Sequence, residues 1–249
     1  MRFLLIHGAF HGAWCWEPVI RELEAAGHSA TAVDLPGAGD DTTPIGDVTL
    51  DSYADRVCAA LAAEEAPVVV VAHSMGGMAA TQAAARCPGQ IAALIYVCAF
   101  LPADGQSLVD LTELPEGAGD MVQANMIVEG EPPTATMPRG PAREAFYGMC
   151  TDEQAGWAVE RIQPQPLAPF VTPASLGEGA DDGPPRFYIV STQDKSIPPA
   201  LQRRMARERA TAEVVEIEAD HSPFLSATGE LVGLLERFGA AAGAPAPMR

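Results

Sequence analysis

The sequence predicts a single α/β domain, in which helices flank a mostly parallel, twisted β-sheet and a cap segment is inserted into the chain. Short apolar runs alternate with segments of helical pattern. This alternation is interrupted once and then resumes. Continuous apolar runs, as opposed to strictly alternating ones, are typical of strands that are covered on both faces. Strands that alternate with helices therefore indicate a parallel sheet wrapped by helices.

Four strands and three helices are predicted before this alternation is interrupted. The strands are rich in valine and isoleucine and cover residues 3–6, 30–33, 68–71 and 92–97. The segments with alanine and leucine at helical spacing cover residues 16–26, 50–63 and 76–86. Gly27 directly follows the first helical segment and is a suitable C-terminal cap, because glycine adopts the left-handed conformation without strain.

Residues 102–185 lack this alternation and are dense in proline and glycine. We call them the cap segment. A compact domain seldom holds about 80 residues without secondary structure, so we expect short elements here, with Met149, Trp157 and Ile162 on one or two short helices. The alternation of strands and helices then resumes, with predicted strands at 186–191 and 213–217 and predicted helices at 200–209 and about 230–238. Residues 1–101 and 186–240 form the predicted core, and the Ala-, Gly- and Pro-rich tail 241–249 is expected to be frayed.

Composition and charge exclude several classes of protein. The 249 residues are 48% hydrophobic and 19% charged, which is typical of a globular chain, and the net charge is −18 with a single lysine. A nucleic-acid-binding face or a face for anionic membranes requires basic residues, so we expect neither partner. The longest apolar run, residues 91–101, is shorter than the ~20 residues that a membrane-spanning helix requires.

The start of the chain and its cysteines predict a cytoplasmic protein. The first apolar stretch ends at His7 after four residues, which is too short for a secretory leader and fits a strand. The five cysteines have no regular spacing, and we expect them to be reduced, buried thiols.

The sharpest local pattern is VVVVAHSMGG at residues 68–77, where a buried strand runs directly into Ser74. A serine on such a strand-to-helix turn needs small residues two positions before it and two after it. Ala72 and Gly76 meet this requirement, although the usual pattern has glycine in the first position. The pattern predicts that Ser74 is a nucleophile, and the alternative is a serine that only caps the following helix.

A serine nucleophile requires a histidine base that is oriented by a carboxylate. In chains wound this way the acid and then the histidine follow the serine, and His221 is the only one of the five histidines that follows Ser74. The acid is expected at the end of the preceding strand, which favours Asp194, with Asp220 and Asp104 as alternatives. A turn carboxylate or an ion-pair partner of the neighbouring lysine is the non-catalytic interpretation of Asp194.

Two backbone N–H groups must stabilise the oxyanion that develops on the substrate. Met75 is expected to supply one of them, and Ala9 in the glycine-containing loop 7–12 the other. The residues expected to support this arrangement are Gly8, His11, His73 and Gly76. His7 and His11 could form a metal site, but no third ligand has suitable spacing. We therefore expect both to hydrogen-bond the loop, and we expect neither a metal nor a cofactor.

Seven segments together resemble the α/β-hydrolase family. They are HGAFHGAW (7–14), EAAGH (24–28), TAVDLPGAG (31–39), AHSMGGM (72–78), AFLP (99–102), YIVSTQDKSIP (188–198) and ADH (219–221). More narrowly, they are similar to the branch of small plant methyl esterases and hydroxynitrile lyases. The resemblance spans nearly the whole core but not the cap segment. It implies a cofactor-free Ser-His-Asp site at Ser74, His221 and Asp194, with Ala9 and Met75 as oxyanion donors.

Two departures distinguish the chain from the lyases of this branch. The lyases carry a lysine just after the catalytic histidine and a threonine beside the histidine of the first loop. This chain has Ser222 and Gly8 at those places. Because it lacks that positive charge, the chain resembles an esterase.

The expected function is a carboxylesterase that cleaves small to medium apolar or aromatic esters through an acyl-enzyme. The alternatives are a hydroxynitrile lyase, a carbon–carbon hydrolase or a secondary-metabolite tailoring enzyme with the same triad, and a non-catalytic ligand receptor. The expected partner is a small-molecule ester, and a homodimer is considered as the assembly. The predicted pocket residues are Phe10, Phe146, Met149, Trp157 and Phe224. Further cap residues that could line the pocket or form the core of the cap are Met121, Met126, Met137, Tyr147 and Phe170.

Overall fold

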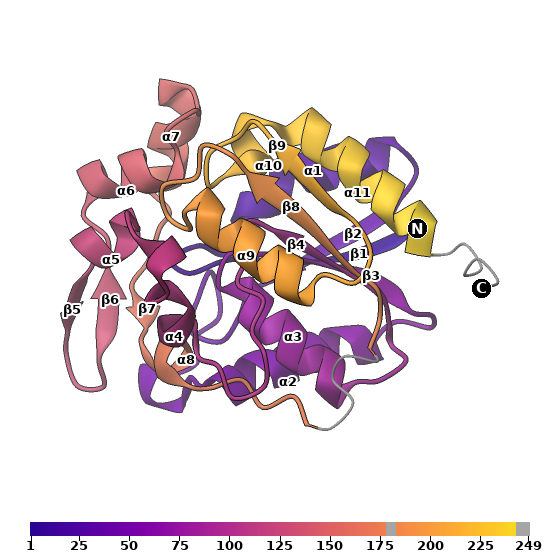
Figure 1. Ribbon diagram of the computed structural model, residues 1–249, viewed down its shortest axis with the longest axis horizontal. Helices are drawn as coiled ribbons and strands as arrows, with labels where there is room; N and C mark the ends of the chain where they lie inside the picture. Colours follow the sequence, from indigo (N-terminus) through magenta and orange to yellow (C-terminus); the bar gives the residue numbers. More distant parts are fainter. Residues whose placement is uncertain (178–182, 243–249) are drawn as a thin grey trace.

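The computed structural model describes residues 1–177 and 183–242. A central sheet has the strand order β2-β1-β3-β4-β8-β9, and all neighbouring strands are parallel. The strands are β1 (Arg2–Ile6), β2 (Ser29–Val33), β3 (Val68–His73), β4 (Ile91–Val97), β8 (Arg186–Ser191) and β9 (Val214–Ile217). Figure 1 shows this sheet between helices, with the elements of the cap segment at one side and the N-terminus at the opposite side.

The strand register brings the functional loops to one edge of the sheet. β1 pairs with β3 up to Ile6 opposite Ala72, and β3 pairs with β4 up to His73 opposite Val97. The carboxyl ends of parallel strands therefore finish at a common edge, where the loops after β1, β3, β8 and β9 meet. This edge is where open α/β sheets bind their ligands.

Side chains that alternate along the strands form the two halves of the core. Leu4 and Val70 belong to the half that contains α2 (Leu50–Ala62), α3 (Gly76–Arg86) and α9 (Pro199–Arg209). Leu5 and Val71 belong to the half that contains α1 (Glu17–Ala25) and α11 (Thr228–Ala242). Because both faces of the sheet are covered at its centre, β1, β3 and β4 are largely apolar runs in the sequence. The edge strands β2 and β9 contain exposed polar residues.

The core elements follow the predicted order, with one difference at the end of the chain. Gly27 adopts a φ of +84°, and the N–H of His28 donates to the carbonyl of Leu23 at 3.0 Å, which is the C-terminal cap that the sequence predicts for α1. The last helix is longer than predicted, since α11 continues to Ala242 through a run of alanines, which favour helix. The remainder of the predicted frayed tail, 243–249, lies outside the described residues.

The cap segment contains the short elements that its length required. Its helices are α4 (Leu108–Thr112), α5 (Met121–Asn125), α6 (Arg139–Phe146), α7 (Asp152–Val159) and α8 (Ala168–Val171). A small antiparallel sheet is formed by β5 (Ile127–Glu129), β6 (Thr134–Thr136) and β7 (Gln165–Pro166). Trp157 lies on α7, whereas Met149 precedes this helix and Ile162 follows it. Further short helices are α10 (Pro223–Ser226) and the 3-10 turns Ala13–Trp16, Ile45–Asp47 and Pro115–Gly117.

The prediction that all five cysteines are reduced was wrong for two of them. Cys58 on α2 and Cys87 at the end of α3 form a disulfide, with Cα atoms 6.0 Å apart. The two helices pack side by side, which brings together cysteines that are distant in sequence. Cys15, Cys98 and Cys150 are free and buried. Only these three cysteines fit the reduced, buried thiols that the cytoplasmic prediction assumed.

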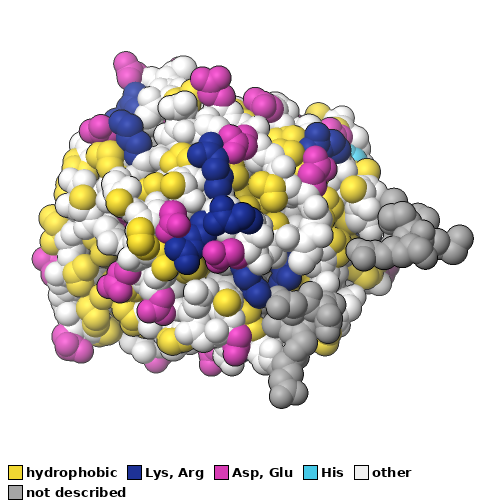
Figure 2. Space-filling model, in the orientation of Figure 1, with side chains coloured by type: hydrophobic (Ala, Val, Ile, Leu, Met, Phe, Trp, Pro, Cys, Tyr) yellow, Lys and Arg dark blue, Asp and Glu magenta, His cyan; other side chains and the backbone are white. Residues whose placement is uncertain are grey.

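Basic side chains gather over α9 on the face shown in Figure 2, next to acidic ones. Arg203 pairs with Glu216 at 2.7 Å, and Arg204 pairs with Glu116 at 2.7 Å and with Glu208 at 3.1 Å. These arginines are therefore matched by carboxylates. Across the described ranges, we find no helix with the length and apolar character that crossing a membrane requires.

Candidate active site

Ser74 lies at the sharp turn between β3 and α3, in a conformation that residues with a side chain seldom adopt. Its φ is +52°. Such a conformation costs on the order of 1–3 kcal/mol and persists only where the surrounding structure enforces it. A Cβ atom on Gly76 would lie 2.5 Å from the carbonyl oxygen of His7, and one on Gly8 would lie 2.6 Å from the Cβ of Ser74. The two glycines therefore let the serine turn sit against the loop after β1.

Ser74, His221 and Asp194 form one continuous hydrogen-bonded chain. Asp194 comes from the loop after β8 and His221 from the loop after β9, both at the carboxyl edge of the sheet. The Oγ of Ser74 lies 3.0 Å from the Nε2 of His221, whose Nδ1 lies 2.8 Å from the Oδ2 of Asp194. All three residues are buried. Because an ionised carboxylate can only accept, Nδ1 carries the proton and Nε2 is free to accept one from the hydroxyl.

Four donors hold the Asp194 carboxylate in place. Its Oδ1 accepts the backbone N–H groups of Ser196 at 2.7 Å and Ile197 at 2.9 Å. Its Oδ2 accepts the ring of His221 and the side-chain amide of Gln202, which lies on α9, at 2.9 Å. The same amide also donates to the carbonyl of Ile197 at 2.7 Å, so its orientation is fixed. Sequence reasoning missed Gln202, because only the folding of α9 onto β8 brings it to the site.

The alternative acids are engaged elsewhere. Asp220 accepts the N–H of Met149 at 2.7 Å and hydrogen bonds from its own loop. Asp104 accepts the N–H of Leu176 at 2.7 Å. Lys195 pairs with a glutamate of α6 at 2.9 Å and not with the neighbouring aspartate. Of the carboxylates weighed from the sequence, only Asp194 hydrogen-bonds the candidate base.

Ala9 and Met75 both line the cavity at the site. Within the part of the chain that the structure describes, neither N–H donates a hydrogen bond. The Nε2 of His7 accepts the N–H of Leu35 at 3.0 Å, so its Nδ1 carries the proton and donates to the carbonyl of Gly8 at 2.8 Å. This carbonyl and the N–H of Ala9 belong to one planar peptide group. His7 thereby fixes the direction in which the Ala9 N–H points.

A second histidine holds the other side of Ala9. The Nδ1 of His11 donates to the carbonyl of Ala9 at 2.7 Å, and its Nε2 accepts the hydroxyl of Tyr147 at 2.8 Å. Burial lowers the pKa of His11 to about 3 and also lowers the pKa of His7, so both rings are neutral at neutral pH. The prediction that both histidines hydrogen-bond this loop is confirmed. No sequence signal indicated the contribution of Tyr147.

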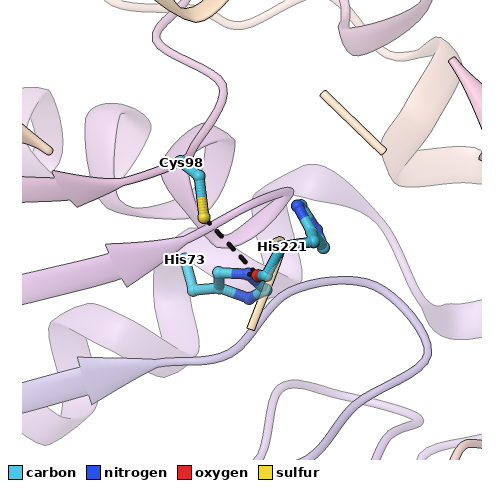
Figure 3. A group of neighbouring side chains, drawn as sticks. All are labelled: His73, Cys98 and His221. Carbon is cyan, nitrogen blue, oxygen red and sulfur yellow. Dashed lines mark hydrogen bonds between the residues drawn. The ribbon is translucent and has the colours of Figure 1, made fainter. Parts of the chain in front are cut away.

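His73, Cys98 and His221 form a cluster whose potential ligand atoms lie within 4.8 Å of one another. Figure 3 shows the ring of His73 and the thiol of Cys98 directed at the backbone carbonyl of His221, at 2.7 Å and 3.5 Å. Burial lowers the pKa of His73 and raises the pKa of Cys98, so the thiol stays protonated. A thiol must lose its proton to bind a metal. The cluster therefore supports the backbone of His221, and the absence of a metal stays a prediction.

A cavity of about 160 Å³ opens over Ser74 and His221. The loop after β1, the core and the cap segment all contribute to its walls. Most of the walls are apolar, and they include Phe10, Phe100, Leu108, Met126, Phe146 and Phe170.

The five residues predicted to form the substrate pocket lie in different places. Phe10 and Phe146 line the cavity. Met149 is 46% exposed and lies outside it. Trp157 packs edge-on against a second indole, with 5.2 Å between ring centroids, and Phe224 is fully buried in the core beneath the site. Trp157 and Phe224 instead pack against other aromatic rings and Met149 is partly exposed, so none of these three side chains lines the cavity.

The fold agrees with the comparison with known proteins. Residues 3–234 match the Alpha/beta hydrolase family. The chain belongs to this family. Methylesterase 7 of Arabidopsis thaliana is 34% identical over 94% of this chain and 94% of its own length. Salicylic acid-binding protein 2 of Nicotiana tabacum is 32% identical over 90% of this chain and 91% of its own. Among solved structures, a pyrethroid hydrolase from Sphingobium faniae JZ-2 has a TM-score of 0.87 at 30% identity, covering 99% of this chain and 98% of that one.

Sequence reasoning also missed Asp120, a carboxylate that lines the cavity of this alpha/beta hydrolase. Its Oδ1 accepts the N–H groups of Val122 at 2.7 Å and Gln123 at 3.1 Å and so caps α5. Burial raises the pKa of Asp120 to about 6. An aspartate before a helix is a capping signal in the sequence, but nothing there shows that it borders a cavity.

Proposed function

We propose that this alpha/beta hydrolase is a carboxylesterase that cleaves small to medium apolar or aromatic esters through an acyl-enzyme on Ser74. The hydrogen-bonded chain from Asp194 through His221 to Ser74, which ends in an apolar cavity, is the observation that carries the proposal. A serine hydroxyl becomes an effective nucleophile when such a base accepts its proton during the attack.

The reaction uses the groups of the site in turn. Ser74 attacks the ester carbonyl while His221 accepts its proton, and Asp194 stabilises the imidazolium. The N–H groups of Ala9 and Met75 donate to the oxyanion, and each contributes about 2.7–4 kcal/mol to lowering the barrier. His221 then protonates the leaving alcohol. Finally it deprotonates the water that releases the acid from Ser74.

The size of the cavity and the relatives support a small substrate. The cavity volume is about 160 Å³. A cavity of about 150 Å³ holds one benzene molecule, so a ring-sized acyl group fits. The methylesterases among the relatives support an ester of a small alcohol.

Hydrolysis of p-nitrophenyl acetate, p-nitrophenyl butyrate and methyl benzoate tests the proposal in the wild type, Ser74→Ala and Ser175→Ala. We expect Ser74→Ala to lower kcat by several orders of magnitude with an unchanged melting temperature. Ser175 is exposed, so its alanine variant controls for the loss of a hydroxyl elsewhere. A serine-directed phosphonate should add its mass to Ser74.

Hydrolysis that survives in Ser74→Ala would remove this residue from the mechanism. Release of an aldehyde and cyanide from a cyanohydrin, without ester hydrolysis, would favour the lyase alternative. Tight binding of an ester without turnover or labelling would favour a receptor.

A further inference from the structure

The mouth of the cavity is acidic. Thr112, Glu113, Asp120 and Gln123 line both the cavity over Ser74 and a shallow hollow on the adjoining surface, so they lie where the cavity meets solvent. Among the lining residues that the structure describes, there is no lysine or arginine. A ligand that enters the cavity therefore passes carboxylates and no cationic side chain.

The Asp120 carboxylate has one oxygen engaged and one oxygen free. Both helix-capping bonds reach Oδ1, and Oδ2 has no hydrogen-bond partner in the described ranges. Asp194 differs, because four donors occupy its two oxygens. A half-buried carboxylate oxygen beside an apolar wall is stabilised by a donor, and a charged donor forms the strongest hydrogen bond.

The other charged groups around Asp120 leave its charge uncompensated. Glu113 lines the same mouth with the same sign. The backbone carbonyl of Lys195 accepts the N–H of Met121 at the start of α5. The ammonium of Lys195, however, pairs with a glutamate of α6. His221 lowers the pKa of Asp120 and Asp194 raises it, but burial is the largest cause and raises it.

We propose that this alpha/beta hydrolase prefers esters that carry a protonated amine, and that the Asp120 carboxylate binds this amine at the mouth of the cavity. The inference rests on the proposed esterase function and names the substrate class for the same site. The apolar walls reduce the local dielectric and so strengthen the ion pair. The net charge of −18 attracts cationic ligands towards the protein in addition.

Two matched pairs of esters test the preference. On the alcohol side, 2-(dimethylamino)ethyl acetate is compared with 3-methylbutyl acetate, and on the acyl side, methyl 4-(dimethylamino)butanoate with methyl 5-methylhexanoate. Within each pair a protonated nitrogen replaces a C–H group of the same shape. The measured quantity is the ratio of kcat/KM for the cationic ester to kcat/KM for the neutral one, so any general change in activity is divided out.

We expect this ratio to exceed one in the wild type for at least one pair and to fall about tenfold in Asp120→Asn. Asparagine keeps the oxygen that caps α5. The matched control is Asp110→Asn, because Asp110 has the same charge in the same part of the cap segment but does not line the cavity. In this control the ratio should stay at the wild-type value.

The pH dependence of the wild type provides a second measurement that needs no mutation. With a pKa of about 6, Asp120 is ionised above that pH, so the ratio should be high there and should fall as the pH drops through about 6. A pH effect on the shared catalytic steps acts on both esters of a pair and cancels from the ratio. In Asp120→Asn the ratio should not change with pH in this range.

The outcomes separate the two proposals. A ratio that is unaffected by Asp120→Asn and constant with pH, while the neutral esters are hydrolysed in a Ser74-dependent way, would reduce Asp120 to a helix cap and leave the esterase function standing. Failure to hydrolyse any ester of either pair or the p-nitrophenyl esters would overturn both proposals.

Discussion

The core and the cap segment contribute to the same cavity by different means. In the core, Ser74, Asp194 and His221 follow three parallel strands and are held by hydrogen bonds at the carboxyl edge of the sheet. The cap segment adds apolar side chains such as Leu108 and Phe146 from short helices. The sheet thus fixes the groups proposed to perform the chemistry, whereas the cap helices determine the shape of the space above them.

The two regions meet in the loop after β1. Phe10 has a φ of +65°. Its N–H donates to the side chain of Gln165 at 3.4 Å, and its carbonyl accepts the N–H of Gln163 at 2.9 Å. Tyr147, also from the cap segment, hydrogen-bonds His11 in the same loop. The cap segment therefore also positions the loop that presents the Ala9 N–H.

The largest effect is expected from Asp194→Asn in the core. An amide can donate to the Nδ1 of His221, which stabilises the wrong tautomer, and in a known triad this change lowers kcat on the order of 10⁴-fold. Turnover of p-nitrophenyl butyrate measures the loss. Asp104→Asn is the matched control, because Asp104 is one of the two alternative acids and instead accepts a backbone N–H in the cap segment. Equal activity in the two variants would show that Asp194 is not the acid.

A smaller loss is expected from Gly8→Ala. Its new Cβ would lie 2.6 Å from the Cβ of Ser74 and 2.9 Å from the Nδ1 of His73, so the loop that presents the Ala9 N–H must move. Loss of one oxyanion donor costs about 10²–10³-fold in kcat. The control is Gly156→Ala on α7, where the added Cβ meets nothing within 4 Å and alanine favours the helix.

The kinetics of both glycine variants should be read beside their circular dichroism. A folded Gly8→Ala protein with wild-type kcat would mean that the loop does not need its close approach to Ser74. A large loss in Gly156→Ala would mean that the cap segment affects the chemistry more than the fold suggests.

The sequence predicts the core well because its signals are local. Each buried strand is a continuous apolar run, and the motif around Ser74 combines such a strand with small residues that a tight turn requires. The order of elements along a parallel sheet then leads from Ser74 to Asp194 and His221. Their roles remain predictions, but the structure places the three side chains in one hydrogen-bonded chain.

The cap segment and the supporting contacts are less predictable because they depend on tertiary packing. A helix of five to eight residues has too few turns for periodicity to show which face meets the cavity. Trp157 was therefore assigned to the pocket although it packs on the outside of the site, and Asp120 was overlooked. The contact of Gln202 with Asp194 and the disulfide between Cys58 and Cys87 require the mutual position of two elements, which no local pattern specifies.

The smallest effect is expected from Tyr147→Phe, which removes one hydroxyl where the cap segment contacts the core loop. The Nε2 of His11 then loses its buried donor, which costs about 1–3 kcal/mol of stability. Because His11 also holds the carbonyl of Ala9, we expect kcat to fall up to about tenfold, a change of about 1.4 kcal/mol in the barrier. Tyr96→Phe is the matched control, since it removes a buried hydroxyl that bonds Thr81 at 2.8 Å in the core. Thermal unfolding and kcat of the two variants should therefore separate: both lose stability, and only Tyr147→Phe loses turnover. Equal kcat values would show that the cap segment stabilises this loop without orienting the Ala9 N–H.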